Sequence, residues 1–164
     1  MPDFDVVSLP ETDHVEEGDH APDFERPLVN GEYWEDARLS AVADGRLLLV
    51  CHPMDGAFPA TYMWNEIRDR GWTDAIEVVG LSISTPYEHK RFIDDRGIDA
   101  PLFSDPANGV AEEYGIVNDL DGMAEIEEPR PAIFLLEDDL TVEYAWVASE
   151  WPEFPDYDEV DARL

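Results

Sequence analysis

The sequence predicts an α/β fold with a central mixed β-sheet, helices on both faces and a β-hairpin near the C-terminus. Two short apolar runs bounded by turn signals, residues 47–50 and 76–83, are typical of buried strands, and each is followed by a helical pattern. Residues 132–136 and 140–147 form two further strand patterns around an acidic turn, which indicates a hairpin. Strands that alternate with helices and end in a hairpin imply both parallel and antiparallel pairs in one sheet.

A helix is expected directly after the run at residues 47–50. Pro59 suits the first turn of a helix, where no N–H donor is needed, and Gly71 ends the pattern. Between them, apolar residues recur at the i, i+3, i+4, i+7 spacing of one helix face: Ala60, Met63, Trp64 and Ile67. The result is a strand, a turn and a helix in succession, and residues beyond the carboxyl end of such a strand are often functional.

Capping signals place two more helices. Thr85 and Glu88 form the pattern of a capping box around Pro86, which predicts a helix over residues 86–95. Asp105 is a suitable N-cap for a helix over residues 106–114, after a short strand in "APLFSDP".

The last part of the chain contains an alternating strand pattern and one more helix. Three alternate residues of the second hairpin strand are expected to share one more deeply buried face: Val142, Tyr144 and Trp146. A terminal helix is expected to start in "PDYDEV".

The length of 164 residues suggests a single domain, and 44% apolar residues are enough to build a core. We expect an acidic N-terminal extension over residues 1–16 and one domain over residues 17–164. The only cysteine excludes an intrachain disulfide and a cysteine zinc cluster.

Acidic residues dominate the charge of the chain, with 40 Asp and Glu against 10 Lys and Arg. This balance argues against nucleic acid and anionic membranes as partners, because both need clustered basic side chains. The acids are spread through a sequence that also has 11% aromatic residues, so disorder is not expected. We expect a folded protein from a salt-rich cytoplasm, where salt screens the self-repulsion. No apolar run is long enough to span a membrane, and the acidic N-terminus lacks the basic region of a signal peptide.

Five segments resemble the peroxiredoxins of the thiol-specific antioxidant group, a branch of the thioredoxin-like superfamily. In chain order they are "GDHAPDF", "LLLVCHPMDG", "GLSISTPYEHKRF", "PLFSDPANGVAEEYGIV" and "RPAIFLLEDDLTVEYAWV". Together they cover about residues 17–160 in the order and spacing of that family. The resemblance implies a thioredoxin-like fold and thiol-dependent peroxide reduction, which is an oxidoreductase activity.

The resemblance also assigns the family's active-site positions. The family pattern Pro-x-x-x-Thr-x-x-Cys falls on Pro53, Ala57 and Ala60, and its later arginine falls on Arg130. Alanine at the cysteine position has no nucleophile, and peroxide reduction needs a thiolate. The first hypothesis is therefore a degenerate member that binds a small anion or a protein partner through the turn at residues 53–60 and Arg130.

A second hypothesis, an atypical thiol enzyme that uses Cys51, stays open, so the sequence leaves open whether the chain is an enzyme. The sequence favours the interpretation of Cys51 as a small buried core residue, because it ends a buried strand and is not next to a helix N-terminus. His52 is not expected to act as its base, because adjacent strand residues point to opposite faces. The favoured interpretation of His52 is a structural histidine whose ring is hydrogen-bonded.

No cofactor and no metal site is expected. His14 and His20 lie among acidic residues near the N-terminus, where a solvated tail is the favoured reading. The resemblance suggests a thiol reductant or a small anion as partner. Since members of the family commonly dimerise, a homodimer is also an expectation, with Trp151 in a candidate apolar patch.

Overall fold

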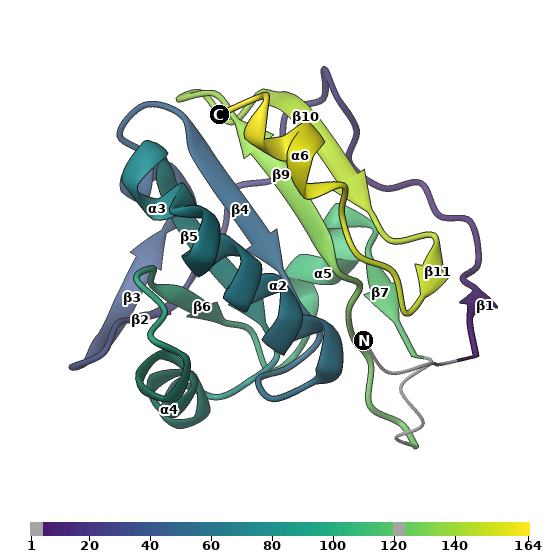
Figure 1. Cartoon of the computed structure of the whole chain (residues 1–164), viewed down its shortest axis with the longest axis horizontal. Coiled ribbons are helices and arrows are strands. Elements are labelled where there is room, and N and C mark those ends of the chain that lie inside the picture. Colours follow the sequence, from purple (N-terminus) through teal and green to yellow (C-terminus); the bar gives the residue numbers. More distant parts are fainter. Residues whose placement is uncertain (1–4, 120–123) are drawn as a thin grey trace.

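The structure is a computed structural model that describes residues 5–119 and 124–164 of the chain (Figure 1). Seven strands form the main sheet in the order β10-β9-β4-β5-β6-β2-β3. Their bounds are β2 Glu25–Val29, β3 Trp34–Arg38, β4 Leu47–Cys51, β5 Glu77–Ser82, β6 Leu102–Ser104, β9 Ala132–Leu136 and β10 Val142–Val147. Strands β4, β5 and β6 run parallel, whereas β9 and β10 form an antiparallel hairpin beside β4. The mixed sheet and the C-terminal hairpin are confirmed.

Helices cover both faces of this sheet, as predicted. One face packs against α2 (Phe58–Arg70), α3 (Trp72–Ala75), α4 (Pro86–Arg96) and α6 (Tyr157–Asp161). The other face packs against α1 (Leu39–Val42) and α5 (Gly109–Tyr114). Strand β4 is buried along its whole length and divides the core, since Leu48 and Val50 face the first group while Leu49 and Cys51 face the second.

The predicted helix signals at α2 and α4 are confirmed. In α2, Pro59 lies in the first turn, and Gly71 ends the helix in the left-handed conformation with φ 70°. In α4, the Thr85 hydroxyl accepts from the Glu88 amide at 3.3 Å, and the Glu88 carboxylate accepts from the Thr85 amide at 3.0 Å. This reciprocal capping box sets the direction in which α4 leaves β5.

The helix predicted over residues 106–114 begins later, at Gly109. The Asp105 carboxylate accepts from the amide of Val110 at 2.8 Å, and Asn108 takes a left-handed φ of 61°. The side chain predicted as N-cap therefore closes a turn over residues 106–108 before the helix begins. The terminal helix is confirmed as α6, with Asp156 as its N-cap.

The face prediction for the last hairpin strand is wrong at Val142. The register of β10 shifts between Val142 and Tyr144, as at a β-bulge. Val142 consequently packs in the core beside α5, whereas Tyr144 packs in the core beside α2 and Trp146 lies against the same core. An extra residue in one strand reverses the alternation of faces, which a two-residue period cannot anticipate.

The short strand predicted in "APLFSDP" is confirmed as β6, but the exposed edge hairpin and the two-residue strands were not predicted from the sequence. The hairpin of β2 and β3 forms one edge of the sheet, and most of its residues are exposed or half-buried. Four two-residue strands complete the described structure, namely β1 (Val7–Ser8), β7 (Val117–Asn118), β8 (Glu128–Pro129) and β11 (Glu150–Trp151).

The described part of the predicted N-terminal extension lies along the domain. Strand β1 pairs with β11, and the amide of Leu9 donates to the Ser149 carbonyl at 2.9 Å. Leu9 and Val15 are buried, so this acidic segment contributes to the core. The boundary at residue 16 stays a prediction. Among the described residues, none of the helices combines the length and apolar character needed to cross a membrane.

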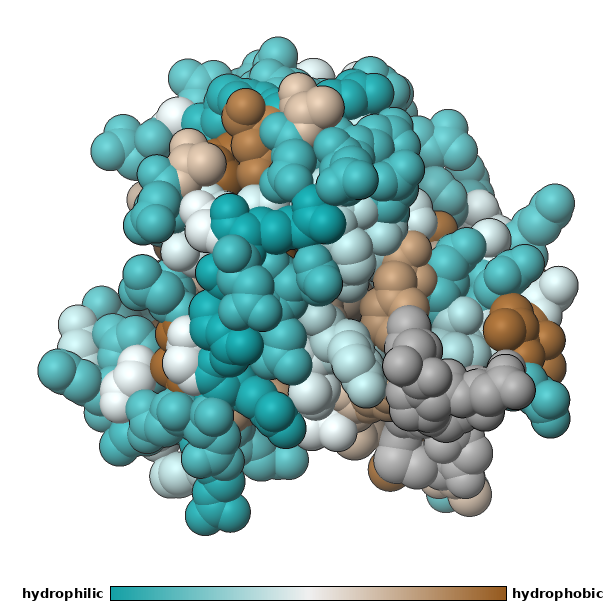
Figure 2. Space-filling model, viewed as in Figure 1, coloured by the Kyte–Doolittle hydropathy of each residue, from teal (hydrophilic) through white to brown (hydrophobic). Residues whose placement is uncertain are grey.

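The net charge of the chain leads us to expect that its folding depends on salt. Figure 2 shows a surface that is mainly hydrophilic in this view, as a net charge of −30 requires. We expect the protein to be folded in about 1 M KCl and to lose far-UV circular dichroism in about 0.01 M KCl, because the Debye length grows from roughly 3 Å to 30 Å. An unchanged spectrum in dilute buffer would contradict this expectation.

Candidate functional site

The turn between β4 and α2 brings three of the predicted site positions together. Pro53 is buried in the turn, Ala57 is the N-cap of α2, and Ala60 is the third residue of that helix. Ala60 is completely buried and belongs to the core between α2 and the sheet. The turn thus directs the first amides of a thirteen-residue helix toward this region, but it presents no thiol or hydroxyl at positions 57 and 60.

The N-terminus of α2 lacks a side-chain cap, since Ala57 makes no such hydrogen bond. We expect Ala57→Ser to stabilise the fold by about 1 kcal/mol, because the extended backbone of residue 57 (φ −62°, ψ 148°) suits an N-cap. A serine hydroxyl could accept from the amide of Ala60, whereas Pro59 has no amide proton. Urea unfolding in high salt measures the change, with Ala57→Gly as the comparison. A serine variant no more stable than the wild-type protein would contradict the expectation.

Cys51 lies on the other side of the sheet from Ala60. Its side chain is completely buried in the core beside α5. Burial, with a smaller contribution from the Asp105 carboxylate, raises the pKa of the Cys51 thiol far above its ordinary value. A buried thiol that stays protonated is a poor nucleophile, so this environment favours the structural reading of Cys51.

Arg130 is buried and bound by main-chain carbonyl groups. Its guanidinium donates to the carbonyls of Pro10 at 2.8 Å, Val117 at 3.2 Å and Ala148 at 3.4 Å. These bonds tie the N-terminal segment, β7 and the end of β10 to one side chain. The backbone of Arg130 lies two residues before Ala132, which pairs with Cys51 at the end of β4. Binding of an anion by Arg130 at the turn stays a prediction.

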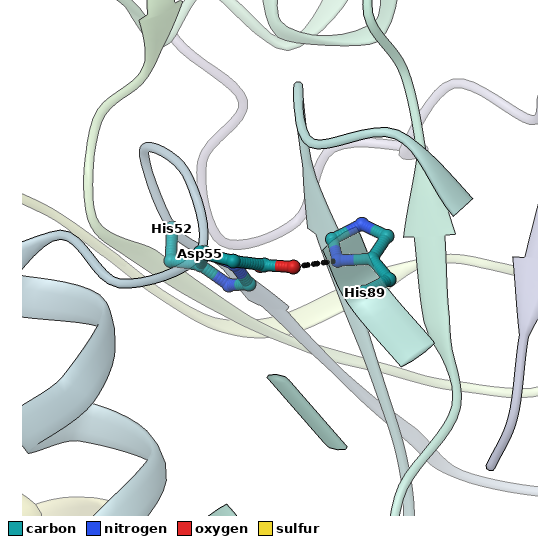
Figure 3. A group of neighbouring side chains, drawn as sticks. All are labelled: His52, Asp55 and His89. Atoms are coloured by element: carbon teal, nitrogen blue, oxygen red, sulfur yellow. Dashed lines mark hydrogen bonds and ion pairs between the residues drawn. The ribbon is translucent and has the colours of Figure 1, made fainter. Parts of the chain in front are cut away.

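A cluster of three polar side chains fills the space behind the turn (Figure 3). Asp55 lies between two histidines, with one carboxylate oxygen 2.7 Å from His52 Nε2 and the other 2.7 Å from His89 Nδ1. Both histidines are completely buried. The outer ring nitrogens have partners as well, since Trp64 Nε1 donates to His52 Nδ1 at 3.0 Å and His89 Nε2 lies 2.9 Å from the Phe103 carbonyl.

These partners define where the protons lie. The indole N–H of Trp64 can only donate, so His52 Nδ1 is unprotonated and Nε2 carries the proton that points to Asp55. The Phe103 carbonyl can only accept, so His89 Nε2 carries a proton. With Asp55 ionised, His89 Nδ1 must donate as well. The cluster therefore contains a carboxylate, a neutral His52 and a doubly protonated His89.

The electrostatics of Asp55 and His52 agree with the protonation states assigned to these two residues. Burial alone raises the pKa of Asp55, but the hydrogen bonds from His52 and His89 outweigh it and lower that pKa to about 2. Burial lowers the pKa of His52, and Asp55 offsets this only in part. Asp55 is thus ionised and His52 is neutral at ordinary pH.

Comparison with known proteins identifies the family of this chain. The family model described as AhpC/TSA family matches residues 17–145, which is most of the chain. The chain belongs to the AhpC/TSA family. The family resemblance seen in the sequence is confirmed.

Relatives within and around the AhpC/TSA family agree with this placement. A thiol peroxidase of Staphylococcus aureus is 27% identical over 146 residues, which covers 88% of this chain and 84% of that protein. The crystal structure of Peroxidoxin BcpB from Mycobacterium tuberculosis is similar at 27% identity with a TM-score of 0.73, covering 91% of this chain and 94% of that one. Enterococcus faecalis AhpC has a TM-score of 0.71 at 16% identity, covering 93% of this chain and 89% of that one, and supports the fold alone. The thioredoxin-like fold is confirmed.

Sequence reasoning missed Asp55 and His89 as members of the cluster. A usable signal was present, because His52 follows β4 and His89 lies in the helix that follows β5. Strands β4 and β5 are parallel neighbours, and segments that follow the carboxyl ends of such strands meet at one edge of the sheet. The interpretation of His52 as a hydrogen-bonded structural histidine agrees with its two polar partners.

A pocket of about 380 Å³ opens beside this cluster in the AhpC/TSA fold. Charged and aromatic residues line it, namely Asp55, Glu88, Asp95, Arg91, Tyr87 and Phe92. At its rim, Tyr87 is 73% exposed and packs edge-on against Trp34 with ring centroids 4.9 Å apart. Asp55 is the residue that connects the pocket with the buried histidines.

Proposed function

We propose that this AhpC/TSA member does not reduce peroxide by the thiol mechanism of its family and acts instead as a binding protein. The observation that carries the proposal is that the helix position matched to the nucleophile is Ala60, while the only thiol is buried beyond the sheet at Cys51. A thiolate that attacks peroxide must be exposed and polarised.

The binding surface that we propose is the β4–α2 turn with the adjacent pocket. Of the two ligands expected from the sequence, a protein partner has more support than a small anion at Arg130. The Arg130 guanidinium already donates to three carbonyls, whereas the pocket rim exposes the aromatic pair Trp34 and Tyr87. Aromatic side chains of this kind are enriched at protein interfaces. A homodimer, a thiol reductant as partner and a cytoplasmic location remain further proposals.

A peroxide assay in high salt tests the absence of thiol chemistry. We expect no turnover of hydrogen peroxide with a dithiol reductant, and no reaction of Cys51 with a thiol probe until the protein unfolds. Cys51→Ser is the matched control and should behave like the wild-type protein. Turnover that disappears in Cys51→Ser would establish the alternative, an atypical thiol enzyme that uses Cys51.

Restoring the family pattern should recover part of the chemistry. We expect the double variant Ala60→Cys with Ala57→Thr to gain weak peroxidase activity, because the thiol would sit at the N-terminus of α2, where the helix dipole favours a thiolate. The gain should be small, since position 60 is completely buried. Activity with peroxide and titration of the new thiol measure the effect, and Ala57→Thr alone is the control. An ordinary thiol pKa, about 8.5, in a folded variant would show that the active-site frame is not retained.

A further inference from the structure

We propose that Asp55 and His89 bind a divalent transition-metal ion, of which Zn²⁺ is the type, behind the pocket wall that Asp55 forms. The proposal goes beyond the proposed binding function, which needs no metal, and beyond the sequence, which predicted no metal site. Within the described part of the chain, His52, Asp55 and His89 bring ligand-type atoms within 4.8 Å of one another. Imidazole nitrogen and carboxylate oxygen are ligands that such ions accept.

The spacing of the two ligand atoms is close to what a metal requires. His89 Nδ1 and the nearer Asp55 oxygen are 2.7 Å apart. Two ligands that each lie about 2.0–2.2 Å from one ion are roughly 3.0–3.4 Å apart, so a shift of a few tenths of an ångström suffices. The other nitrogen of His89 donates to the Phe103 carbonyl at 2.9 Å, which orients Nδ1 toward the ion. When the metal binds, the doubly protonated His89 releases its Nδ1 proton to solvent, so that a neutral imidazole is the ligand.

His52 supports this site without binding the metal. Its Nδ1 accepts from the Trp64 indole, so its proton lies on Nε2 and points to the second Asp55 oxygen. His52 is already neutral, so a metal bond to Nε2 would require its one ring proton to leave or to move to Nδ1. A proton on Nδ1 would face the indole N–H of Trp64. His52 therefore acts as a positioning residue that holds the carboxylate in place.

The pocket supplies access and a favourable charge. Asp55 lines a cavity of about 380 Å³, which has room for the waters that would complete the coordination of the ion. The carboxylates of Glu88 and Asp95 line the same cavity, opposed by the guanidinium of Arg91. A cavity lined by more acids than bases raises the local concentration of cations.

Cobalt(II) is the probe for the first test, because its visible spectrum reports coordination. In about 1 M KCl, where surface charges are screened, we expect Co²⁺ to bind the full chain saturably. The visible absorption bands of the bound Co²⁺ should change when a ligand residue is replaced. His89→Gln should weaken binding at least about tenfold, and His52→Gln should weaken it by about 10–100-fold. The matched control, His14→Gln with His20→Gln, should bind as the wild-type protein does.

Two results would overturn the proposal. One is the absence of saturable binding by the wild-type protein. The other is a folded His89→Gln variant of unchanged affinity, which would mean that surface carboxylates bind the ion.

Proton NMR of the unmodified protein decides the question if the variants do not fold. The chain has four histidines, so their ring signals can be assigned. Paramagnetic Co²⁺ should broaden the signals of His52 and His89 at concentrations that leave His14 and His20 sharp. Broadening of His14 and His20 alone would overturn the proposal.

Discussion

Asp55→Ala is expected to lower the free energy of unfolding by about 3–5 kcal/mol, which is the usual effect of removing one partner from a buried charge pair. The change leaves the Nε2 proton of His52 and the Nδ1 proton of His89 without their acceptor. Both histidines are completely buried, so water cannot easily replace the carboxylate. His89 can respond by releasing its Nδ1 proton, which limits the loss.

Urea unfolding in high salt, followed by circular dichroism, measures the effect of Asp55→Ala. Asp95→Ala is the matched control, because Asp95 lines the same pocket but is an exposed residue. We expect the control to change the free energy of unfolding by less than about 0.5 kcal/mol. Equal effects of the two substitutions would show that the cluster does not stabilise the fold.

The same pair of proteins gives a dependence on pH. The pKa of Asp55 in the folded protein, about 2, is below the ordinary value of 3.8 for an aspartate, so its ionised form stabilises the fold above that ordinary value. This contribution falls as the pH falls from about 4 through 2. The difference in unfolding free energy between wild type and Asp55→Ala should therefore shrink over this range. A difference that grows on acidification would contradict the assignment of an ionised Asp55.

Gly80→Ala is expected to cost about 1–3 kcal/mol, which is the usual effect of overpacking a core. A Cβ atom at Gly80 would lie 2.4 Å from Leu102 Cδ2 and 2.7 Å from Trp64 Cζ2. Leu102 is the end of a flexible side chain, but it is completely buried, and the Trp64 ring is held by its hydrogen bond to His52. Strain at Gly80 would thus reach the cluster behind the β4–α2 turn.

The unfolding free energy measures the effect of Gly80→Ala, and the near-UV circular dichroism of the protein, to which Trp64 contributes, reports a change in core packing. Gly31→Ala is the matched control, because its nearest neighbour, Asp94 Oδ1, would be at an ordinary contact distance of 3.6 Å. We expect little change in that variant. A Gly80→Ala protein as stable as the control would show that the side chains around Trp64 can rearrange to accommodate the added methyl group.

Local signals predicted the parts of the fold that local chemistry controls. The capping box of α4 and the apolar face of α2 depend on residues three or four positions apart, which a sequence displays directly. The hairpin of β2 and β3 could not be found in this way. It is an exposed edge whose link to the sheet is the pairing of residues 28–29 with Phe103 and Leu102, far along the chain.

The same distinction between local signals and long-range packing applies to the candidate site. The sequence alone determined the strand, turn and helix around residues 47–70, the family resemblance and the absence of a thiol at Ala60. Only the tertiary structure decided that Cys51 is enclosed on one face of the sheet while His52 meets Asp55 and His89 on the other. His89 is 34 residues from Asp55, and the parallel pairing of β4 with β5 brings them together. The physical reason is that the burial of a side chain and the identity of its hydrogen-bond partners depend on which distant segments pack side by side. This packing is a property of the folded chain.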